Sequence, residues 1–308
     1  MTASLTSRRS SRRDSLKLLA WSRTDTGRKR DHNEDNFVVV SELELFAVAD
    51  GMGGHQGGEH ASRLALEVFS REVGAAQGDF EAARIRIRQQ DKFRTVELHI
   101  DPKTGEPLPG PGAESDDDDD DDSDDGEIDR SAASAIMSAA ARKASSAVFA
   151  AALDDPELRG MGTTMTAMLH HRGKMHLCHA GDSRCYLLRD GKIQQLTEDH
   201  SWIQEQIKLG VMSEAEAKTS QFRHIITRSV GFERDVEVDC TGIAVEAGDC
   251  FLLCSDGMSN YVDGEELGEV MARTWYRRLP ETLINMANDR GGDDNITVIV
   301  IYAANDTE

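Results

Sequence analysis

Short apolar runs separated by turn signals dominate the chain, and most of them have the length of a β-strand. Runs of this kind, bounded by glycine, asparagine and aspartate, are typical of strands in a sheet with a buried face. The turns at 171–173 and 189–191 join neighbouring runs as hairpins. The sequence predicts strands over residues 16–23, 37–40, 43–49, 93–100, 161–169, 174–180, 184–188, 192–196, 237–245, 251–254 and 296–302.

Helical periodicity is found in a second set of segments. Between residues 58 and 73, Ala61, Leu64, Ala65, Val68 and Phe69 fall on one face of a helix with charged residues opposite. Further helices are expected over residues 131–153, 201–209, 264–275 and 281–289, and Ser213 and Glu216 have the spacing of a capping box. The chain is therefore predicted to have an α+β fold.

Four of the apolar runs carry an aspartate at one end. Asp50, Asp182 and Asp256 follow their runs, whereas Asp294 precedes its run. If the fourth run is antiparallel to the others, all four carboxylates reach one rim of the sheets. Ionised carboxylates in a cluster repel one another and need a cation. An all-oxygen ligand set favours Mg²⁺ or Mn²⁺ over zinc, which points to metal-assisted hydrolysis or phosphoryl chemistry.

Charge is distributed unevenly along the 308 residues. The formal net charge is −21, and residues 114–130 alone contain twelve acids and one arginine, whereas the first thirty residues are basic. This balance argues against nucleic-acid binding, because phosphate contacts need a basic face. No apolar run approaches the ~20 residues that span a bilayer, so no membrane association is expected.

The N-terminus and the cysteines indicate a compartment. Arg12 and Arg13 resemble a twin-arginine export signal, but the apolar stretch after them ends at Trp21, which favours a basic tail. The five cysteines are odd in number and show no disulfide spacing. Free thiols and a cytoplasmic location are therefore expected.

The chain reads as one domain with two unusual segments. Residues 1–14 are expected to be a flexible basic tail, and residues 15–305 a single domain. Within it, residues 74–130 form an acidic insertion that is partly disordered, because the seven aspartates Asp116–Asp122 repel one another. Residues 198–228 form a polar, mobile-looking stretch.

Six motifs in order give these features a family resemblance. They are Arg30-x-x-Asn33-Glu34-Asp35, Asp50-Gly51-Met52-Gly53-Gly54-His55, Gly162-Thr163-Thr164, Gly181-Asp182-Ser183-Arg184-x-Tyr186, Ser255-Asp256-Gly257 and Asp293-Asp294-Asn295-Ile-Thr. Together they resemble the metal-dependent protein phosphatases (PPM, or type 2C Ser/Thr phosphatases), most closely the bacterial branch. The resemblance covers about residues 16–303, except the insertion.

The resemblance implies a four-layer αββα sandwich of two antiparallel sheets flanked by helices, with a binuclear Mn²⁺ or Mg²⁺ site and possible room for a third ion. In this family pattern Asp50 bridges the two metals and the carbonyl of Gly51 contacts one of them. Asp256 and Asp294 hold the other metal, Glu34 and Asp35 act through waters, Asp182 joins Asp256 at a third position, and Arg30 clamps the phosphate. The 198–228 stretch corresponds to the family's flap beside the active site.

Several roles stay open at this level. Met52 occupies the position where many eukaryotic members place a general-acid histidine, so His55 is either an assisting acid or substrate contact, or a loop residue that caps the helix starting near Gly58. His32 and His200 are expected at the surface. Ser201 and Arg223 are candidate substrate contacts.

The acidic candidates also have alternatives. Asp182 is either a metal ligand or a partner that orients Arg184 by a salt bridge. Asp293 is an alternative to Asp294 as the ligand. Glu34 is an alternative partner for Arg30 in the turn.

These observations predict an active phosphatase, because every expected metal aspartate is present. The expected activity is hydrolysis of phosphoserine and phosphothreonine by a metal-activated water, opposing Ser/Thr kinases, in a cytoplasmic monomer whose partners are phosphoproteins. The alternatives are a phosphatase-like regulatory binding module and a hydrolase of small phosphate esters on the same fold.

Overall fold

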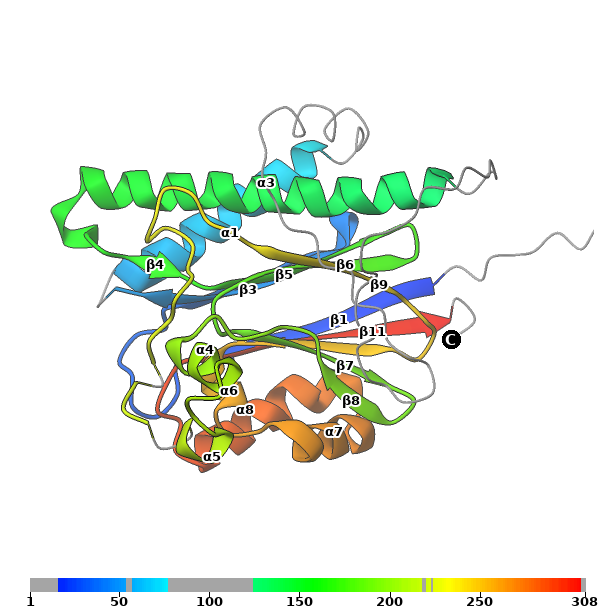
Figure 1. The fold of residues 1–308 in the computed structure, drawn as a ribbon. Helices are drawn as coiled ribbons and strands as arrows, with labels where there is room; N and C mark the ends of the chain where they lie inside the picture. The colour runs from blue at the N-terminus through cyan, green and yellow to red at the C-terminus, as the bar shows by residue number, and fades with distance from the viewer. Residues whose placement is uncertain (1–15, 54–56, 77–123, 218–219, 223, 306–308) are drawn as a thin grey trace, which may run out of the picture.

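The computed structural model describes residues 16–53, 57–76, 124–217, 220–222 and 224–305. Two antiparallel sheets lie face to face in the centre of the molecule (Figure 1). The strands of the first sheet, in spatial order, are β1 (Leu16–Asp25), β11 (Ile296–Asn305), β10 (Cys250–Cys254), β7 (Arg184–Arg189) and β8 (Lys192–Gln195). The strands of the second are β2 (Asp35–Val40), β3 (Leu45–Met52), β5 (Met165–His171), β6 (Lys174–Ala180) and β9 (Asp239–Ala244), with β4 (Gly162–Thr163) paired to β3.

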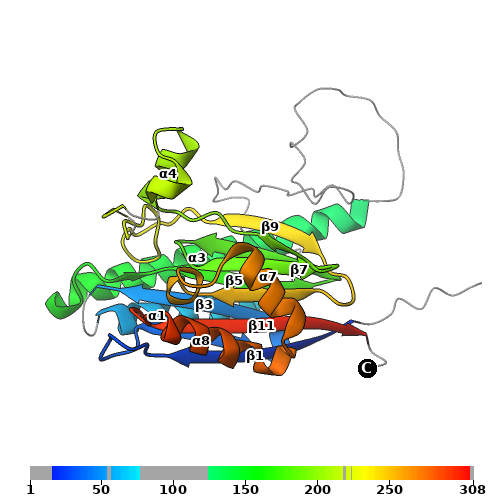
Figure 2. The same ribbon diagram turned by 90° about the horizontal axis from the view of Figure 1, so that it is seen from below.

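Helices cover the outer face of each sheet. The long helices α1 (Gly57–Ala76) and α3 (Asp124–Asp154) lie on the second sheet, and α7 (Gly264–Arg273) and α8 (Leu279–Asp289) lie on the first (Figures 1 and 2). Three short helices, α4 (Trp202–Lys208), α5 (Glu214–Ala217) and α6 (Asp256–Ser259), lie toward one end of the sandwich (Figure 1). Short 3₁₀ turns occupy Ser41–Leu43, Pro156–Leu158 and Tyr276–Arg278.

Alternation along the strands builds three hydrophobic layers. In β11, Val298 and Val300 face the layer under α7 and α8, whereas Ile299 and Ile301 face the layer between the sheets. A third layer lies between the second sheet and the helices α1 and α3. Because successive side chains of a strand point to opposite faces, a central strand with both faces covered must be apolar throughout. The predicted four-layer αββα sandwich is confirmed.

The strand directions bring the acidic ends together. β3, β6 and β10 run toward one rim: Asp50 lies near the end of β3, Asp182 and Asp256 follow β6 and β10, and β11 starts there just after Asp294. β10 and β11 are antiparallel, with Cys254 opposite Val298. The predicted common rim is therefore present. The β2–β3 register adds Asp35 directly opposite Asp50.

Most expected elements are found, and the two long helices that cover the second sheet are longer than the pattern predicted. The helix expected over 58–73 runs over Gly57–Ala76, and the one expected over 131–153 runs over Asp124–Asp154. Residues at both ends of the predicted 74–130 insertion thus belong to helices. The tail 1–14, the strand expected at 93–100 and the aspartate run lie outside the described residues. Within the described part, no helix has both the length and the apolar character of a membrane span.

The layer between the sheets gives a test of packing. Ile301 is fully buried there, so Ile301→Val is expected to cost about 0.5–1.5 kcal/mol of unfolding free energy through the lost methylene and the small cavity it leaves. Ile225→Val makes the same change at a side chain that is 45% exposed and should cost less than about 0.5 kcal/mol. Urea denaturation measures both. Equal costs would contradict this packing.

Candidate metal centre

Backbone atoms pack closely where β3 meets α1. A Cβ added at Gly51 would lie 2.1 Å from the carbonyl oxygen of Gly58, and one added at Gly58 would lie 2.8 Å from the Glu34 carboxylate. Side chains are thus excluded at both glycines. This close approach sets Asp50 and the carbonyl of Gly51 beside Glu34 at the rim.

Asp35 is held inside the rim by a hydroxyl. Its side chain is buried, and its Oδ2 accepts a hydrogen bond of 2.7 Å from Ser255 Oγ, while its Oδ1 is buried without a hydrogen-bond partner. Burial raises the pKa of Asp35 to about 7, against the lowering effect of the Ser255 bond, and the charges of Asp256 and Asp294 raise it further. Oδ1 of Asp35 is therefore the oxygen that a cation or a water molecule could contact.

Burial and the charges of neighbouring carboxylates also raise the pKa values of three other carboxyls at the rim. Burial, then the charge of Asp35, raises the pKa of Asp50 well above its ordinary value. Burial, then the charge of Asp256, does the same for Asp182, and burial followed by Asp294 raises the pKa of Asp256. Such mutual effects require the side chains to converge, as the sequence predicted.

The donor set fits hard divalent cations. Asp256 Oδ1, like Asp35 Oδ1, is buried without a hydrogen-bond partner, and buried anionic oxygens of this kind are costly unless a cation or a donor meets them. Among the described residues, no group of three or more His, Cys, Asp or Glu side chains is placed so that it could hold a metal ion by itself. Water molecules would therefore complete the coordination, as is usual for Mg²⁺.

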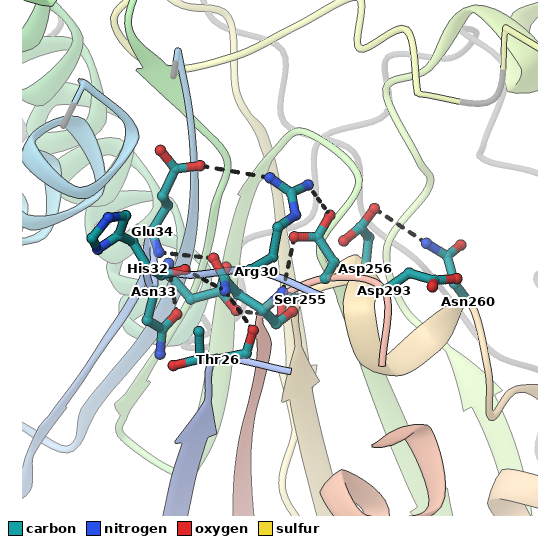
Figure 3. A network of polar contacts seen from close by, with 12 residues as sticks. Thr26, Arg30, His32, Asn33, Glu34, Ser255, Asp256, Asn260 and Asp293 are labelled. Atoms are coloured by element: carbon teal, nitrogen blue, oxygen red, sulfur yellow. Dashed lines mark hydrogen bonds and ion pairs between the residues drawn. The ribbon is translucent and has the colours of Figure 1, made fainter. Parts of the chain in front are cut away.

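Arg30 crosses the mouth of this cluster. Its Nη2 donates to Asp294 Oδ2 at 2.7 Å, and its Nη1 lies 4.0 Å from Glu34 Oε2 (Figure 3). The side chain is 46% exposed, so the guanidinium is available to solvent and to a phosphate. Arg30 thus pairs with both acids, but its contact with Glu34 is long for an ion pair, and its contact with Asp294 is the shorter one.

Asp293 is engaged elsewhere. Its carboxylate forms a salt bridge of 3.1 Å with Lys29 and accepts a hydrogen bond from the hydroxyl of Tyr261. Asp294, in contrast, contacts Arg30 and raises the pKa of Asp256. Of the two acids, Asp294 is the one placed in the cluster.

Arg184 has another partner than Asp182. Its Nε donates to Asp199 Oδ1 at 2.9 Å and its Nη2 donates to Asp199 Oδ2 at 2.7 Å. The structure therefore gives the salt bridge of Arg184 to Asp199, and Asp182 faces the cavity beside Asp256. That leaves Asp182 available as a ligand.

Asn295 supports the site and was not assigned a role from the sequence. Its Oδ1 accepts the backbone N–H of Glu34 at 2.8 Å, and its Nδ2 donates to the carbonyl oxygens of Thr26 and His32, both at 2.9 Å (Figure 3). One amide thus ties β11 to the turn that carries Arg30 and Glu34. The only feature of the sequence that could have indicated this role is the position of Asn295 directly after Asp294.

His200 corrects a prediction. It was expected at the surface, but it is only 9% exposed. Its Nδ1 accepts the backbone N–H of Gly181 at 3.1 Å, so in the neutral ring Nε2 carries the proton and donates to Asp239 Oδ2 at 3.0 Å. His200 therefore fixes the loop that leads into Asp182. His32, by contrast, is exposed as predicted.

Of the three remaining candidate substrate contacts, the structure describes only Ser201. His55 and Arg223 lie outside the described residues, so their expected roles stay predictions. Ser201 caps α4, since its Oγ accepts the N–H of Gln204 at 3.3 Å. It also lines a cavity of about 650 Å³ whose lining includes Asp182, Asp256 and Asp294. The 198–228 segment thus borders the site.

Ser255 offers a test of this support. Ser255→Ala removes the donor that holds Asp35, and losses of such supporting bonds cost about 10–100-fold in activity or metal affinity. We expect a decrease of that size in metal-dependent phosphate release. Thr282→Ala removes an exposed hydroxyl of α8 that bonds only a backbone carbonyl and serves as the control. Similar activity in both variants would contradict a supporting role for Ser255.

Comparison with known proteins gives a consistent set of similarities. The family model for protein phosphatase 2C matches residues 25–290. The serine/threonine phosphatase stp of Listeria monocytogenes is 30% identical over 283 residues, covering 91% of this chain and 93% of that protein. The serine/threonine protein phosphatase PstP of Mycobacterium tuberculosis is 33% identical over 288 residues, 94% of this chain and 45% of PstP.

Solved structures agree with the sequence comparison. The crystal structure of the Mycobacterium tuberculosis serine/threonine phosphatase PstP/Ppp superposes with a TM-score of 0.71 and 30% identity. The match covers 94% of this chain and 100% of the PstP chain. The PstP catalytic domain in complex with two manganese ions has a TM-score of 0.68 and 31% identity, over 94% of this chain and 100% of that one.

Proposed function

This chain belongs to the protein phosphatase 2C family, and on that premise we propose how its own residues perform the hydrolysis. It is a Mn²⁺- or Mg²⁺-dependent serine/threonine phosphatase that acts on phosphoproteins. We propose that Asp50 and the carbonyl of Gly51, with Asp256 and Asp294, hold the two ions. The observation that carries this assignment is the convergence of the buried carboxyls of Asp35, Asp50 and Asp256, whose pKa values are raised by burial and by neighbouring carboxylates. Asp35 and Asp256 each have a buried oxygen without a hydrogen-bond partner.

The remaining residues have positioning roles in this proposal. Bound ions of this kind activate a water molecule and neutralise charge on the phosphoryl group. Glu34 and Asp35 accept hydrogen bonds from the waters that complete the coordination, and Ser255 keeps Asp35 oriented. Asp182, freed from Arg184, contributes with Asp256 to a third position.

Arg30 binds the substrate phosphate in this proposal. A guanidinium presents a planar fork of donors that suits two oxygens of a tetrahedral anion. Its contacts with Asp294 and Glu34 hold it at the mouth of the cluster, where a phosphate oxygen can replace one carboxylate partner. His55, for which the sequence left open an assisting-acid role, is proposed to contact the substrate.

We also propose that the enzyme works as a monomer in the cytoplasm, opposing Ser/Thr kinases. All five cysteines are buried and free, which supports a reducing compartment. The 1–14 tail and the acidic 74–130 segment are proposed to lie outside the catalytic machinery, and 198–228 to act as the flap. Size-exclusion chromatography with light scattering tests the monomer, and a dimer mass would contradict it.

The proposed function is tested by phosphate release from a phosphothreonine peptide. The metal-stripped enzyme should be inactive, and Mn²⁺ should restore turnover, because the carboxyl cluster has no other means of activating water. A small alkyl phosphate such as glycerol phosphate is assayed in parallel and should be a poorer substrate. Turnover that survives EDTA would contradict the metal mechanism, and turnover of the small ester alone would favour the small-ester alternative.

A further inference from the structure

A histidine of the flap segment, residues 198–228, faces the carboxyl cluster. His224 lines the same cavity of about 650 Å³ as Asp182 and Asp256. Among the described residues that line this cavity, no other is a histidine. The side chain is exposed, so it is accessible to a substrate that enters the cavity.

The chain on the C-terminal side of His224 is fixed to the start of α4. The carbonyl oxygen of Ile225 accepts the backbone N–H of Trp202 at 2.9 Å, and Ile226 forms an isolated antiparallel bridge with Ser201. These contacts begin one residue after His224. Its backbone therefore has a defined position relative to α4.

The same short ladder continues to the metal cluster. Thr227 donates its backbone N–H to the carbonyl oxygen of His200 at 2.9 Å, and His200 donates its own to the carbonyl oxygen of Gly181 at 2.7 Å. Gly181 directly precedes Asp182. The segment that follows His224 is thus connected by consecutive hydrogen bonds to the loop that carries a candidate ligand.

The chain on the N-terminal side is held by an aromatic contact. The ring of Phe222 packs edge-on against the ring of Trp202, with 5.1 Å between centroids. Such pairs contribute about 0.5–1.5 kcal/mol beyond their buried area. His224 is therefore held between two contacts with Trp202, one through a ring and one through the backbone.

Several carboxylates line the cavity that contains His224. Burial and then Asp294 raise the pKa of Asp256, and the charge of His224 lowers it. Asp263 and Asp293 also line the cavity, as does Asp199, whose charge is compensated by Arg184. His224 therefore shares its cavity with the acids proposed to hold the ions.

Hydrolysis of a serine or threonine phosphate needs a proton donor. The leaving group is an alkoxide, which is a poor leaving group unless it receives a proton as the bond to phosphorus breaks. Met52 stands next to Gly51 and cannot donate one. A side chain that donates this proton must lie beside the carboxyl cluster and be accessible to the phosphorylated residue.

We propose that His224 is the general acid that protonates the leaving oxygen of the phosphorylated serine or threonine. The inference rests on the proposed function. A bond forms between the oxygen of the attacking water and phosphorus, and the bond from phosphorus to the side-chain oxygen breaks. The electron pair of that bond stays on the leaving oxygen, which takes the imidazolium proton and becomes the alcohol. Of the two protons of the attacking water, one stays on the product phosphate and the other passes to solvent, and the imidazole regains a proton from solvent.

The experiment compares two leaving groups in His224→Gln. With a phosphothreonine peptide, kcat should fall about 100-fold, the lower end for loss of a general acid. With 4-nitrophenyl phosphate, kcat should change less than about 3-fold, because the aryl oxygen leaves without needing a proton. The control is His171→Gln, the same change on the β5–β6 hairpin, which should leave both rates as in the wild type.

Each other outcome has a defined meaning. Equal losses on both substrates, or a shifted Mn²⁺ concentration for half-maximal rate, would show that His224 positions the flap or binds an ion, and would overturn the inference. Unchanged kcat on the peptide would overturn it as well. A wild-type enzyme that fails to hydrolyse the peptide with Mn²⁺ would instead overturn the proposed function, and this inference with it.

Discussion

Asp50→Asn is expected to lower metal-dependent turnover by more than about 100-fold, since even a supporting partner of a ligand accounts for about 10–100-fold. Asp50 is the carboxyl whose pKa responds to burial and to four other rim acids, Asp35, Asp256, Asp182 and Asp294. Its carboxyl is therefore close enough to all four of them to be affected by their charges. An asparagine oxygen keeps the shape of the side chain but removes the charge that attracts the cations.

The same variant should fold normally. In EDTA its melting temperature should equal or exceed that of the wild type, because a buried, mutually repelling carboxyl has been neutralised. The matched control is Asp293→Asn, which removes a carboxylate bonded to Lys29 and Tyr261 and should keep most activity. Full turnover in Asp50→Asn, or inactivity in Asp293→Asn alone, would show that the ligands have been assigned to the wrong acids.

The metal-free protein should lose stability as the pH rises through neutrality. The pKa of Asp35 is about 7 in the folded state and has an ordinary value of 3.8, so the folded state binds more protons between these values. Unfolding then releases protons, and its free energy falls as the pH increases up to and through 7. The raised pKa values of Asp50, Asp182 and Asp256 act in the same direction.

Divalent cations should remove this loss. Binding to the folded state at 100 times the dissociation constant contributes about 2.7 kcal/mol, or roughly 4 °C in melting temperature for a chain of 308 residues. The increase on adding Mg²⁺ should be larger at pH 8 than at pH 6.5, because the ligands must be deprotonated. Thermal melts at these two pH values, with EDTA or Mg²⁺, measure both effects.

Measurements between pH 6.5 and 8, together with the variant Asp35→Asn, separate the effect of the buried carboxyls on stability from that of a buried histidine. Burial, then the charge of His200, lowers the pKa of His179 to about 3, so this histidine makes stability rise with pH, but only up to about its ordinary value of 6.5. Above pH 6.5 its contribution is nearly constant. Asp35→Asn should flatten the decline in EDTA between pH 6.5 and 8. A metal-free stability that increases over this interval would contradict the buried-carboxyl account.

The rim of acids was predictable because it depends on strand ends alone. Asp50, Asp182 and Asp256 each follow a buried run and Asp294 precedes one, so antiparallel pairing was enough to bring them together. The helix under residues 58–73 was equally evident from its apolar face. Both inferences use only local periodicity, which a single sequence displays directly.

The supporting contacts were not predictable because their partners are distant in the chain. His200 lies in a polar stretch, and only the fold brings it to Gly181 and to Asp239, 39 residues away. The contacts of Asn295 with residues near the N-terminus are more than 250 positions apart in sequence. Polar side chains with nonlocal partners give no periodic signal, so burial cannot be inferred from their neighbours.

The central claim is that the acids at the common rim hold a pair of divalent cations. Diffraction from crystals grown with Mn²⁺, collected where manganese scatters anomalously, tests it directly. The account predicts two strong anomalous peaks separated by roughly 3.5–4 Å, between Asp50 and the Asp256–Asp294 pair. Peaks located elsewhere, or carboxyl groups of these three residues directed apart with no peak between them, would contradict it.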